Sequence, residues 1–251
     1  MASAQFRFYE ELNDFLPAER RKVDFRYEFD RRASIKDVIE ALGVPHTEVE
    51  LILVNGESVG FGYILCHGDR VSVYPLFETL DVTPLLRLRP RPMRTPRFVL
   101  DTHLGTLARY LRLLGFDTLY RNDYEDATLA RISANEDRIL LTRDQGLLKR
   151  RIITHACFVR SDTPREQLRE ICARLDLHDL IAPFRRCARC NGLLRDVEKA
   201  NIAHRLAPKT RLYYDRFRQC DNCGHLYWAG SHYRHLTRLV DSVRRERAQW
   251  R

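Results

Sequence analysis

The chain has 251 residues, of which 44% are hydrophobic and 31% are charged, and its formal net charge is +9. This length allows two domains or one large domain with an attachment, and the composition is that of a globular protein. The sequence shows no apolar run as long as a membrane span and no signal-peptide pattern at its start, so we expect a cytoplasmic protein without a membrane partner.

Charge is unevenly distributed along the chain. Residues 1–80 carry 9 basic and 14 acidic side chains, residues 81–180 carry 18 and 14, and residues 181–251 carry 16 and 6. A strongly basic C-terminal part predicts a polyanionic partner, most simply nucleic acid. The alternative is a basic surface that contacts only solvent.

Two strands and a helix are predicted at the start of the chain. QFRFYEEL (5–12) and KVDFRYEF (22–29) alternate with the period of half-buried strands. SIKDVIEALG (34–43) has the apolar spacing of a helix, with Ser34 as a candidate N-cap and Gly43 just past the last turn.

A hairpin and a further strand follow. VELILVNGESV (49–59) holds two short apolar runs around Asn55-Gly56, and DRVSVYPLF (69–77) is predicted to be a strand. This order resembles a ubiquitin-like β-grasp domain, and in particular the small sulfur carriers. Those carriers end in Gly-Gly, whereas Phe77-Glu78-Thr79-Leu80 stands here and the chain continues. We therefore expect an α+β domain that docks a partner or stabilises the chain.

The segment DVTPLLRLRPRPMRTP (81–96) holds four prolines and four arginines, which predicts an extended linker. Beyond it, strand and helix patterns alternate. Strands are expected at 97–101, 116–120, 138–142 and 156–160, and helices at 106–115, 126–137, 146–151 and 163–177. This alternation predicts a mostly parallel α/β sheet flanked by helices.

Aspartates follow the predicted strands of this sheet. Asp101 lies at the exit of the first strand, Asp144 just past the third, and Asp162 after the fourth, while Asp126 opens the helix before the third. Ligands bind outside the carboxyl ends of parallel strands, so we expect these groups to surround one depression. Clustered carboxylates repel one another unless a divalent cation neutralises them, and their hard oxygen ligands suit Mg²⁺ or Mn²⁺.

Each of these aspartates also has a structural alternative. Three of them suit helix N-caps, and Asp144 suits a turn. Asp123 and Glu136 lie close enough in the sequence to compete for the same role.

The stretch from FVLDTHLGTLARYLRLLG (98–115) to RILLTRDQGLLKRR (138–151) resembles a PIN-like ribonuclease domain. More narrowly, it resembles the mutator-seven C-terminal RNase family, in which some bacterial members begin with a ubiquitin-like module and the nuclease domain is followed by a zinc ribbon. The resemblance implies a metal-dependent ribonuclease whose acids are Asp101, Asp126 and Asp144, with Asp162 as the fourth.

Four of the seven cysteines form two Cys-x-x-Cys pairs, CARC and CDNC. Such pairs predict a closed structural Zn²⁺ site with four thiolate ligands, here Cys187, Cys190, Cys220 and Cys223. The alternative is a set of reduced core thiols. The surrounding FRRCARCNGLL and FRQCDNCGHLYWAGSH resemble the ribbon of the same family. The isolated Cys66, Cys157 and Cys172 are expected to be buried.

Arginines and aromatic residues are interleaved around the cysteine pairs. Arginines bind phosphates and aromatic rings stack on unpaired bases, which predicts single-stranded RNA as the partner. We expect RNA contacts from Arg143, Arg186, Arg189, Arg211 and Arg218. Alternatively, aromatic residues such as Tyr227 and Trp228 form the small core of the ribbon.

Together, these patterns and the family resemblance predict a ubiquitin-like domain at 1–80, a linker at 81–96, a PIN-like RNase domain at 97–182, and a zinc ribbon with a basic helix at 183–251. The predicted function is hydrolysis of RNA phosphodiester bonds at a carboxylate-bound Mg²⁺ or Mn²⁺ centre, with the ribbon holding RNA. Two alternatives are a non-catalytic RNA-binding protein and an adaptor that docks a protein partner through its ubiquitin-like domain.

Overall fold

The computed structural model describes residues 1–75 and 96–246. The chain divides into two compact units, Met1–Thr95 with Asp126–Phe158 and Pro96–Glu125 with Val159–Arg251. Apart from Pro96, the predicted linker lies outside the described residues, as does the position where sulfur carriers have their Gly-Gly tail.

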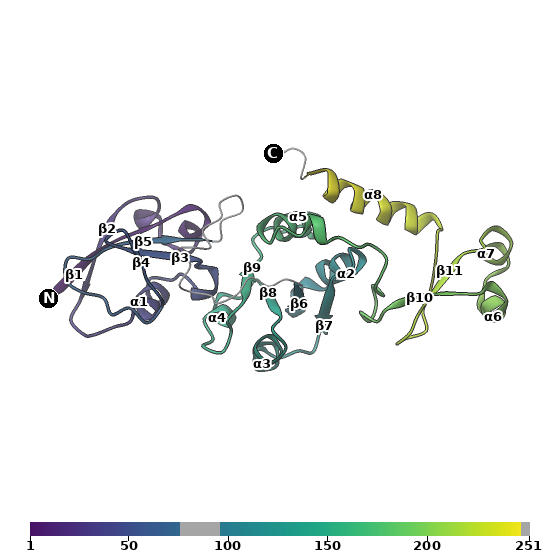
Figure 1. Ribbon diagram of the computed structural model, residues 1–251, viewed down its shortest axis with the longest axis horizontal. Coiled ribbons are helices and arrows are strands. Elements are labelled where there is room, and N and C mark those ends of the chain that lie inside the picture. Colours follow the sequence, from purple (N-terminus) through teal and green to yellow (C-terminus); the bar gives the residue numbers. More distant parts are fainter. Residues whose placement is uncertain (76–95, 247–251) are drawn as a thin grey trace. The chain divides into compact units, whose positions relative to one another are not determined.

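The first unit begins with a five-stranded sheet in the order β2-β1-β5-β3-β4. Its strands are β1 (Ala2–Phe8), β2 (Phe25–Phe29), β3 (Leu51–Val54), β4 (Glu57–Ser58) and β5 (Arg70–Tyr74). β1 and β5 are parallel, and the other pairs are antiparallel. Helix α1 (Ile35–Ala41) packs on one face (Figure 1). The predicted β-grasp fold is confirmed.

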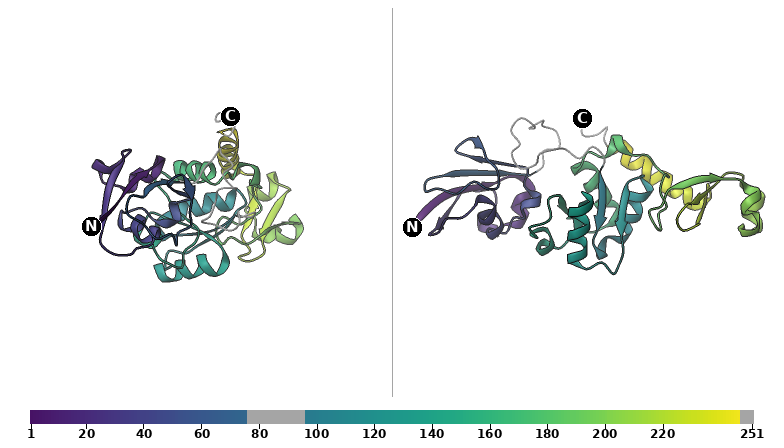
Figure 2. Two further views of the ribbon diagram at one scale, coloured as in Figure 1. Left: turned by 60° about the vertical axis from the view of Figure 1, so that its left-hand side comes forward. Right: turned by 60° about the horizontal axis from the view of Figure 1, so that its bottom comes forward.

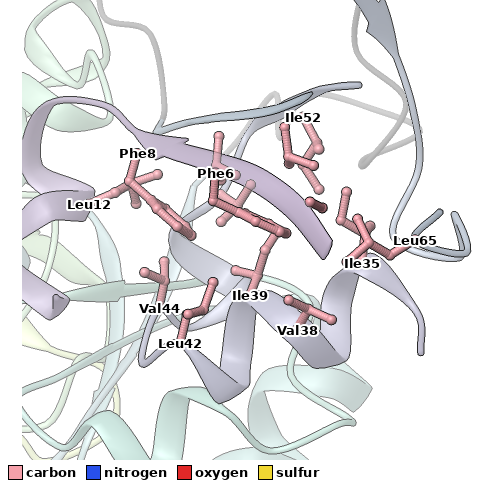
Figure 3. Packing of buried hydrophobic residues seen from close by; sticks show 14 of the residues in the cluster. Phe6, Phe8, Leu12, Ile35, Val38, Ile39, Leu42, Val44, Ile52 and Leu65 are labelled. Carbon is pink, nitrogen blue, oxygen red and sulfur yellow. The ribbon is translucent and has the colours of Figure 1, made fainter. Parts of the chain in front are cut away.

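The core of this domain lies between the sheet and the helix. Phe6 of β1 points toward Ile39 of α1 and Phe8 toward Val44 just beyond the helix (Figure 3), and all four side chains are at most 1% exposed. Alternating residues of a strand face the same side of a sheet, which is why the predicted period of two places both phenylalanines in the core. Burial of each of these side chains contributes about 1.5–3 kcal/mol to the free energy of unfolding.

The predicted turns are confirmed. The Ser34 hydroxyl accepts a hydrogen bond from the N–H of Asp37 at the start of α1, and Gly43 beyond its end has a φ of +112°. Asn55 and Gly56, with φ values of 53° and 89°, join β3 to β4. Two successive positive φ values are typical of the tight hairpin turns that Asn-Gly favours.

One predicted strand is shorter than expected. β1 ends at Phe8, and Glu10–Phe15 form a 3₁₀ helix instead of continuing it. The Asn13 side chain donates to the carbonyl oxygens of Phe8 and Glu10 at 3.0 and 2.9 Å, which closes the chain into a turn. The prediction of a strand over 5–12 was therefore wrong in its second half, residues 9–12.

The rest of the first unit consists of α3 (Asp126–Glu136), β8 (Ile139–Thr142), α4 (Gln145–Leu148) and β9 (Ala156–Phe158). β8 and β9 are parallel. Every residue of β8 is buried, as its continuous apolar run predicts.

The β-grasp domain contacts β9 within this unit. The carboxylate of Glu48 accepts the N–H of Phe158 at 2.6 Å, and Nε2 of His46 lies 2.9 Å from the carbonyl oxygen of Ile153. The rings of Phe15 and Phe158 pack edge to face with centroids 5.5 Å apart. β9 is the last strand in the order of its sheet, so the hydrogen bond from Phe158 to Glu48 covers a backbone group of an edge strand.

The second unit begins with a βαβ element of β6 (Arg97–Leu100), α2 (Gly105–Leu113) and β7 (Asp117–Tyr120). β6 and β7 are parallel, and α2 packs against β7 and α5 (Pro164–Arg174) (Figure 1). Gly115 ends α2 with a φ of +101°, and a Cβ there would overlap the carbonyl oxygen of Ala182. The predicted parallel α/β architecture is confirmed.

The C-terminal part of this unit holds an antiparallel sheet of β10 (Leu194–Val197), β11 (Phe217–Cys220) and β12 (Leu226–Trp228). Two short helices, α6 (Lys199–Ile202) and α7 (Pro208–Tyr213), lie side by side at one end of it (Figures 1 and 2). Ile202, Phe217 and Leu226 form its small core. Helix α8 (Ser231–Glu246) follows, with Val240 and Val243 buried.

Candidate active site and cysteine cluster

Asp101 directly follows buried β6, as predicted. It is 8% exposed, and its Oδ1 accepts the N–H of Thr102 at 2.6 Å, at the start of a short 3₁₀ turn. The Tyr120 hydroxyl donates to the carbonyl oxygen of Thr102 at 2.9 Å. A Cβ at Gly105 would lie 2.6 Å from that hydroxyl, so the contact requires glycine. The turn that carries Asp101 is thus held from β7.

Asp162 is exposed, and Thr163 rather than Asp162 caps α5. The backbone before it is held by two side chains of α5. The Glu170 carboxylate accepts the N–H groups of Arg160 and Ser161 at 2.9 and 2.8 Å, and the Gln167 side chain donates to the carbonyl oxygen of Ser161 at 3.0 Å. Sequence reasoning did not single out either residue, because their acceptors and donors are backbone atoms.

Asp126 and Asp144 belong to the other unit. Asp126 is the first residue of α3 rather than its N-cap, and its Oδ2 lies 3.5 Å from the guanidinium of Arg150. Asp144 is the N-cap of α4, and its Oδ1 accepts the N–H of Gly146 at 2.7 Å. The Asp144 N–H in turn donates to the Thr142 hydroxyl at 2.9 Å. Asp126 and Asp144, which the sequence predicts to be metal-binding acids, therefore also make local structural contacts.

The two competing acids are paired with arginines. Asp123 lies 2.6 Å from Arg121, whose hydrogen bonds lower the pKa of that carboxyl, and Glu136 lies 2.8 Å from Arg138. The four predicted acids offer only carboxylate oxygens as ligands. Oxygen ligands of this kind fit Mg²⁺ or Mn²⁺, whereas Zn²⁺ in structural sites is typically bound by thiolates.

The four cysteines of the two Cys-x-x-Cys pairs come together. All four sulfur atoms lie within 4.8 Å of one another, with 3.6 Å between Cys187 and Cys223 and 3.4 Å between Cys190 and Cys220. Four thiolates around Zn²⁺ at a bond length of about 2.3 Å are about 3.8 Å apart, so this arrangement fits a tetrahedral ion. The cluster could hold a metal ion.

Polar groups surround the Cys187 sulfur. Burial raises the pKa of this thiol, but hydrogen bonds from the Tyr227 hydroxyl and from the N–H groups of Cys190 and Arg189 bring it down to about 7. Burial raises the pKa of the other three thiols. Tyr227 thus contacts the cysteine cluster within the ribbon, in agreement with the alternative that this aromatic residue has a structural role there. A Cβ at Gly192 would lie 2.8 Å from the Cys220 sulfur, which explains this glycine.

Comparisons with known proteins identify the family of the chain. Residues 96–240 match the family described as Mut7-C RNAse domain. The chain belongs to the Mut7-C RNase family. Residues 1–81 match the Mut7-C ubiquitin family, and no curated protein matches the chain.

Two crystal structures of small archaeal modifier protein 1 from Haloferax volcanii are similar to the Mut7-C chain. Their sequence identities are 21% and 22%, and both TM-scores are 0.24. The matches cover 30% and 29% of this chain and 98% and 93% of the modifier proteins. Within residues 1–75 and 96–246, no helix is both long and apolar enough to cross a lipid bilayer.

The ribbon of this Mut7-C protein is anchored to α2 and β7. The guanidinium of Arg112, which is 3% exposed, donates to the carbonyl oxygens of Thr118, Ala188 and Arg189 at 2.8, 3.3 and 3.0 Å. The Asn191 side chain accepts the N–H of Thr118 at 3.0 Å. Nothing in the sequence marks Arg112, which lies within an apolar helical pattern.

The arginines expected to contact RNA differ in their surroundings. Arg186 lies 3.4 Å from Asp117, and Arg218 donates to Asp196 at 3.0 Å. Arg189 is exposed, with its guanidinium 3.3 Å from the His225 ring. Arg143, which precedes Asp144 in the sequence, and Arg211 on α7 are also exposed.

The isolated cysteines behave differently from one another. Cys157 and Cys172 are buried as expected, whereas Cys66 is exposed. The expectation for Cys66 was wrong because it lies in a surface turn, where its N–H donates to the buried Asp69 carboxylate at 2.8 Å.

Proposed function

We propose that this Mut7-C family protein is a metal-dependent ribonuclease that hydrolyses RNA phosphodiester bonds. The observation that carries the proposal is the position of Asp101. Its nearly buried carboxylate stands at the carboxyl end of β6, inside the segment that matches the RNase domain, in a turn held by Tyr120. Ligands of open α/β sheets bind in the crevice outside the carboxyl ends of the strands.

The proposed metal ligands are Asp101, Asp126 and Asp144, with Asp162 as the fourth acid. A divalent Mg²⁺ or Mn²⁺ ion bound there would supply an activated water and offset the charge that develops on the phosphodiester. In Asp144 the helix cap engages Oδ1, so the same side chain can present Oδ2 to a ligand. Arg150, which now pairs with Asp126, neutralises part of the negative charge of this group.

The remaining parts have supporting roles in the proposal. The four cysteines bind Zn²⁺ as a structural ion, and the basic ribbon holds single-stranded RNA. The β-grasp domain contacts β9 through Glu48. Its sheet would bind a protein partner. We place the protein in the cytoplasm, where reducing conditions keep zinc-binding thiols from forming disulfides.

The decisive test is Mn²⁺-dependent cleavage of single-stranded RNA by the wild type and by Asp101→Asn and Asp144→Asn. Asparagine keeps the Oδ1 acceptor that each cap uses and removes the charge, so the fold is retained while metal affinity is lost. We expect each variant to lose about 100-fold or more in rate and the wild type to be inactive in EDTA. Asp123→Asn is the matched control, because Asp123 is exposed and paired with Arg121.

A second candidate function is RNA binding without catalysis. It is favoured by the caps that Asp101 and Asp144 make, since these give both residues a structural role. Wild-type protein that binds RNA but never cleaves it with Mg²⁺ or Mn²⁺ would establish this function and refute the proposed nuclease.

A further inference from the structure

The ribbon carries two adjoining hollows. The first has a volume of about 1020 Å³ and the second of about 360 Å³, and His225, Leu226 and Trp228 line both. Pockets for small ligands typically measure about 300–1,000 Å³, so each hollow has room for at least one group the size of a nucleotide.

The walls of the first hollow are mostly apolar and aromatic, with Phe184, Phe217 and Tyr227 among them. Trp228, at the end of β12, is 38% exposed and packs against Phe217 with ring centroids 6.4 Å apart. A large aromatic ring that is fixed on one side and open to solvent on the other is suited to stacking against a planar ligand.

Charge at the rims is positive. Arg216 lines the first hollow and Arg205 the second, and both are exposed. Within the described residues Arg216 makes no ion pair, whereas the two aspartates that line the first hollow are each paired with a cation, Asp196 with Arg218 and Asp215 with Lys199. Residues 181–251 as a whole carry 16 basic and 6 acidic side chains. An anionic ligand is therefore favoured over an apolar peptide.

We propose that these two hollows bind unpaired nucleotides of single-stranded RNA, with a base stacked on Trp228 and neighbouring phosphates on Arg216 and Arg205. The choice of RNA rests on the proposed function, while the site itself rests on the hollows and their charge. Bases in a duplex are stacked on one another and cannot reach an aromatic ring, so the site selects single strands.

Fluorescence provides a direct test. The chain has two tryptophans, so Trp250→Phe leaves Trp228 as the sole tryptophan, whose emission is excited selectively at a wavelength that tyrosine does not absorb. Asp144→Asn is added to prevent cleavage, and the protein is titrated with a single-stranded oligoadenylate and with the matching duplex. We expect saturable quenching by the single strand and none at equal concentration by the duplex.

Variants of the full chain test the residues. Trp228→Ala should weaken oligoadenylate binding about 5- to 100-fold, and Trp228→Phe should retain most of it. Arg216→Ala with Arg205→Ala should reduce the dependence of log affinity on log salt by about 1 to 2. Tyr213→Ala is the control, because Tyr213 is an exposed aromatic residue of the same ribbon that lines neither hollow.

Zinc content and unfolding temperature identify any variant that fails to fold. If Trp228→Ala does not fold, Arg216→Ala with Arg205→Ala carries the test. Quenching without RNA cleavage by the wild type would support the binding site and refute the nuclease. If the wild type cleaved RNA but RNA did not quench Trp228, and Trp228→Ala bound RNA as tightly as the wild type, the proposed binding site would be wrong. The proposed nuclease would still be supported. Quenching by an apolar peptide but not by RNA would also overturn it.

Discussion

The Tyr227 hydroxyl lies 3.1 Å from the sulfur of Cys187 and accepts the N–H of Ala188, also at 3.1 Å. While its oxygen accepts from the backbone, its O–H is within reach to donate to the sulfur. Tyr227 is therefore a polar support of the cysteine cluster, which the aromatic pattern of the sequence alone does not reveal.

Tyr227→Phe keeps the ring and removes this hydrogen bond. Groups that orient metal ligands typically change metal affinity about 10- to 100-fold, so we expect zinc affinity to fall by that factor. Competition with a chromogenic chelator measures it, and Tyr213→Phe, at an exposed tyrosine, should leave the affinity unchanged. Equal zinc affinity in wild type and Tyr227→Phe would show that the hydroxyl does not support the metal site.

Arg112→Ala should loosen the ribbon from α2. The substitution leaves three carbonyl oxygens without this donor, and each unsatisfied buried group costs about 1–3 kcal/mol. We expect a lower urea midpoint and thermolysin cleavage around Cys187–Asn191 in the native protein. Arg109→Ala, at an exposed position of the same helix, is the control. Similar protease resistance in both variants would contradict the anchoring role.

Gly105→Ala should impair catalysis more than folding. The added Cβ would meet the Tyr120 hydroxyl at 2.6 Å and push it away from Thr102, which shifts the turn that carries Asp101. A displacement of about 1 Å at a catalytic group commonly costs about 100-fold in rate. Gly62→Ala is the control, since a Cβ there meets no atom within 4 Å. If Gly105→Ala cleaved RNA at the wild-type rate, the position of this turn would not matter for the reaction.

Glu48→Ala should weaken the contact between the β-grasp domain and β9. Glu48 is 3% exposed, and its loss leaves the Phe158 N–H without this acceptor, at a cost of about 1–3 kcal/mol. Glu48→Gln retains an acceptor oxygen and should cost less. Hydrogen exchange at the Phe158 amide reports the contact directly. Slow exchange in Glu48→Ala would mean that other groups protect this edge.

Local features of the fold could be predicted from the sequence because their causes are local. The Ser34 cap, the Asn55-Gly56 turn, the buried strand at Ile139–Thr142 and the glycine after α2 each depend on residues within a few positions. The cysteine pairs were predictable for a similar reason, since Cys-x-x-Cys places two ligands in one turn.

The side chains that hold the ribbon, β9 and the Asp162 segment in place could not be predicted in this way. Asn191 contacts Asp117 across 74 positions, and Glu48 contacts Phe158 across 110, so no sequence pattern links the partners. Arg112 and Glu170 bind backbone groups, which every residue offers equally. Arg186 and Arg218 illustrate the same limit, because a basic residue in the sequence does not reveal that an aspartate is its neighbour.

The hydrogen bond from Phe158 to Glu48 also bears on how the chain is made. Synthesis proceeds from the N-terminus, and domains generally fold as they emerge. The acceptor belongs to residues translated well before those of β9, and its domain has a core of its own. The surface of the β-grasp domain that binds β9 can therefore form while the chain is still on the ribosome, before β9 is made. It then covers the edge of the new strand, which would otherwise be open to pairing with neighbouring nascent chains.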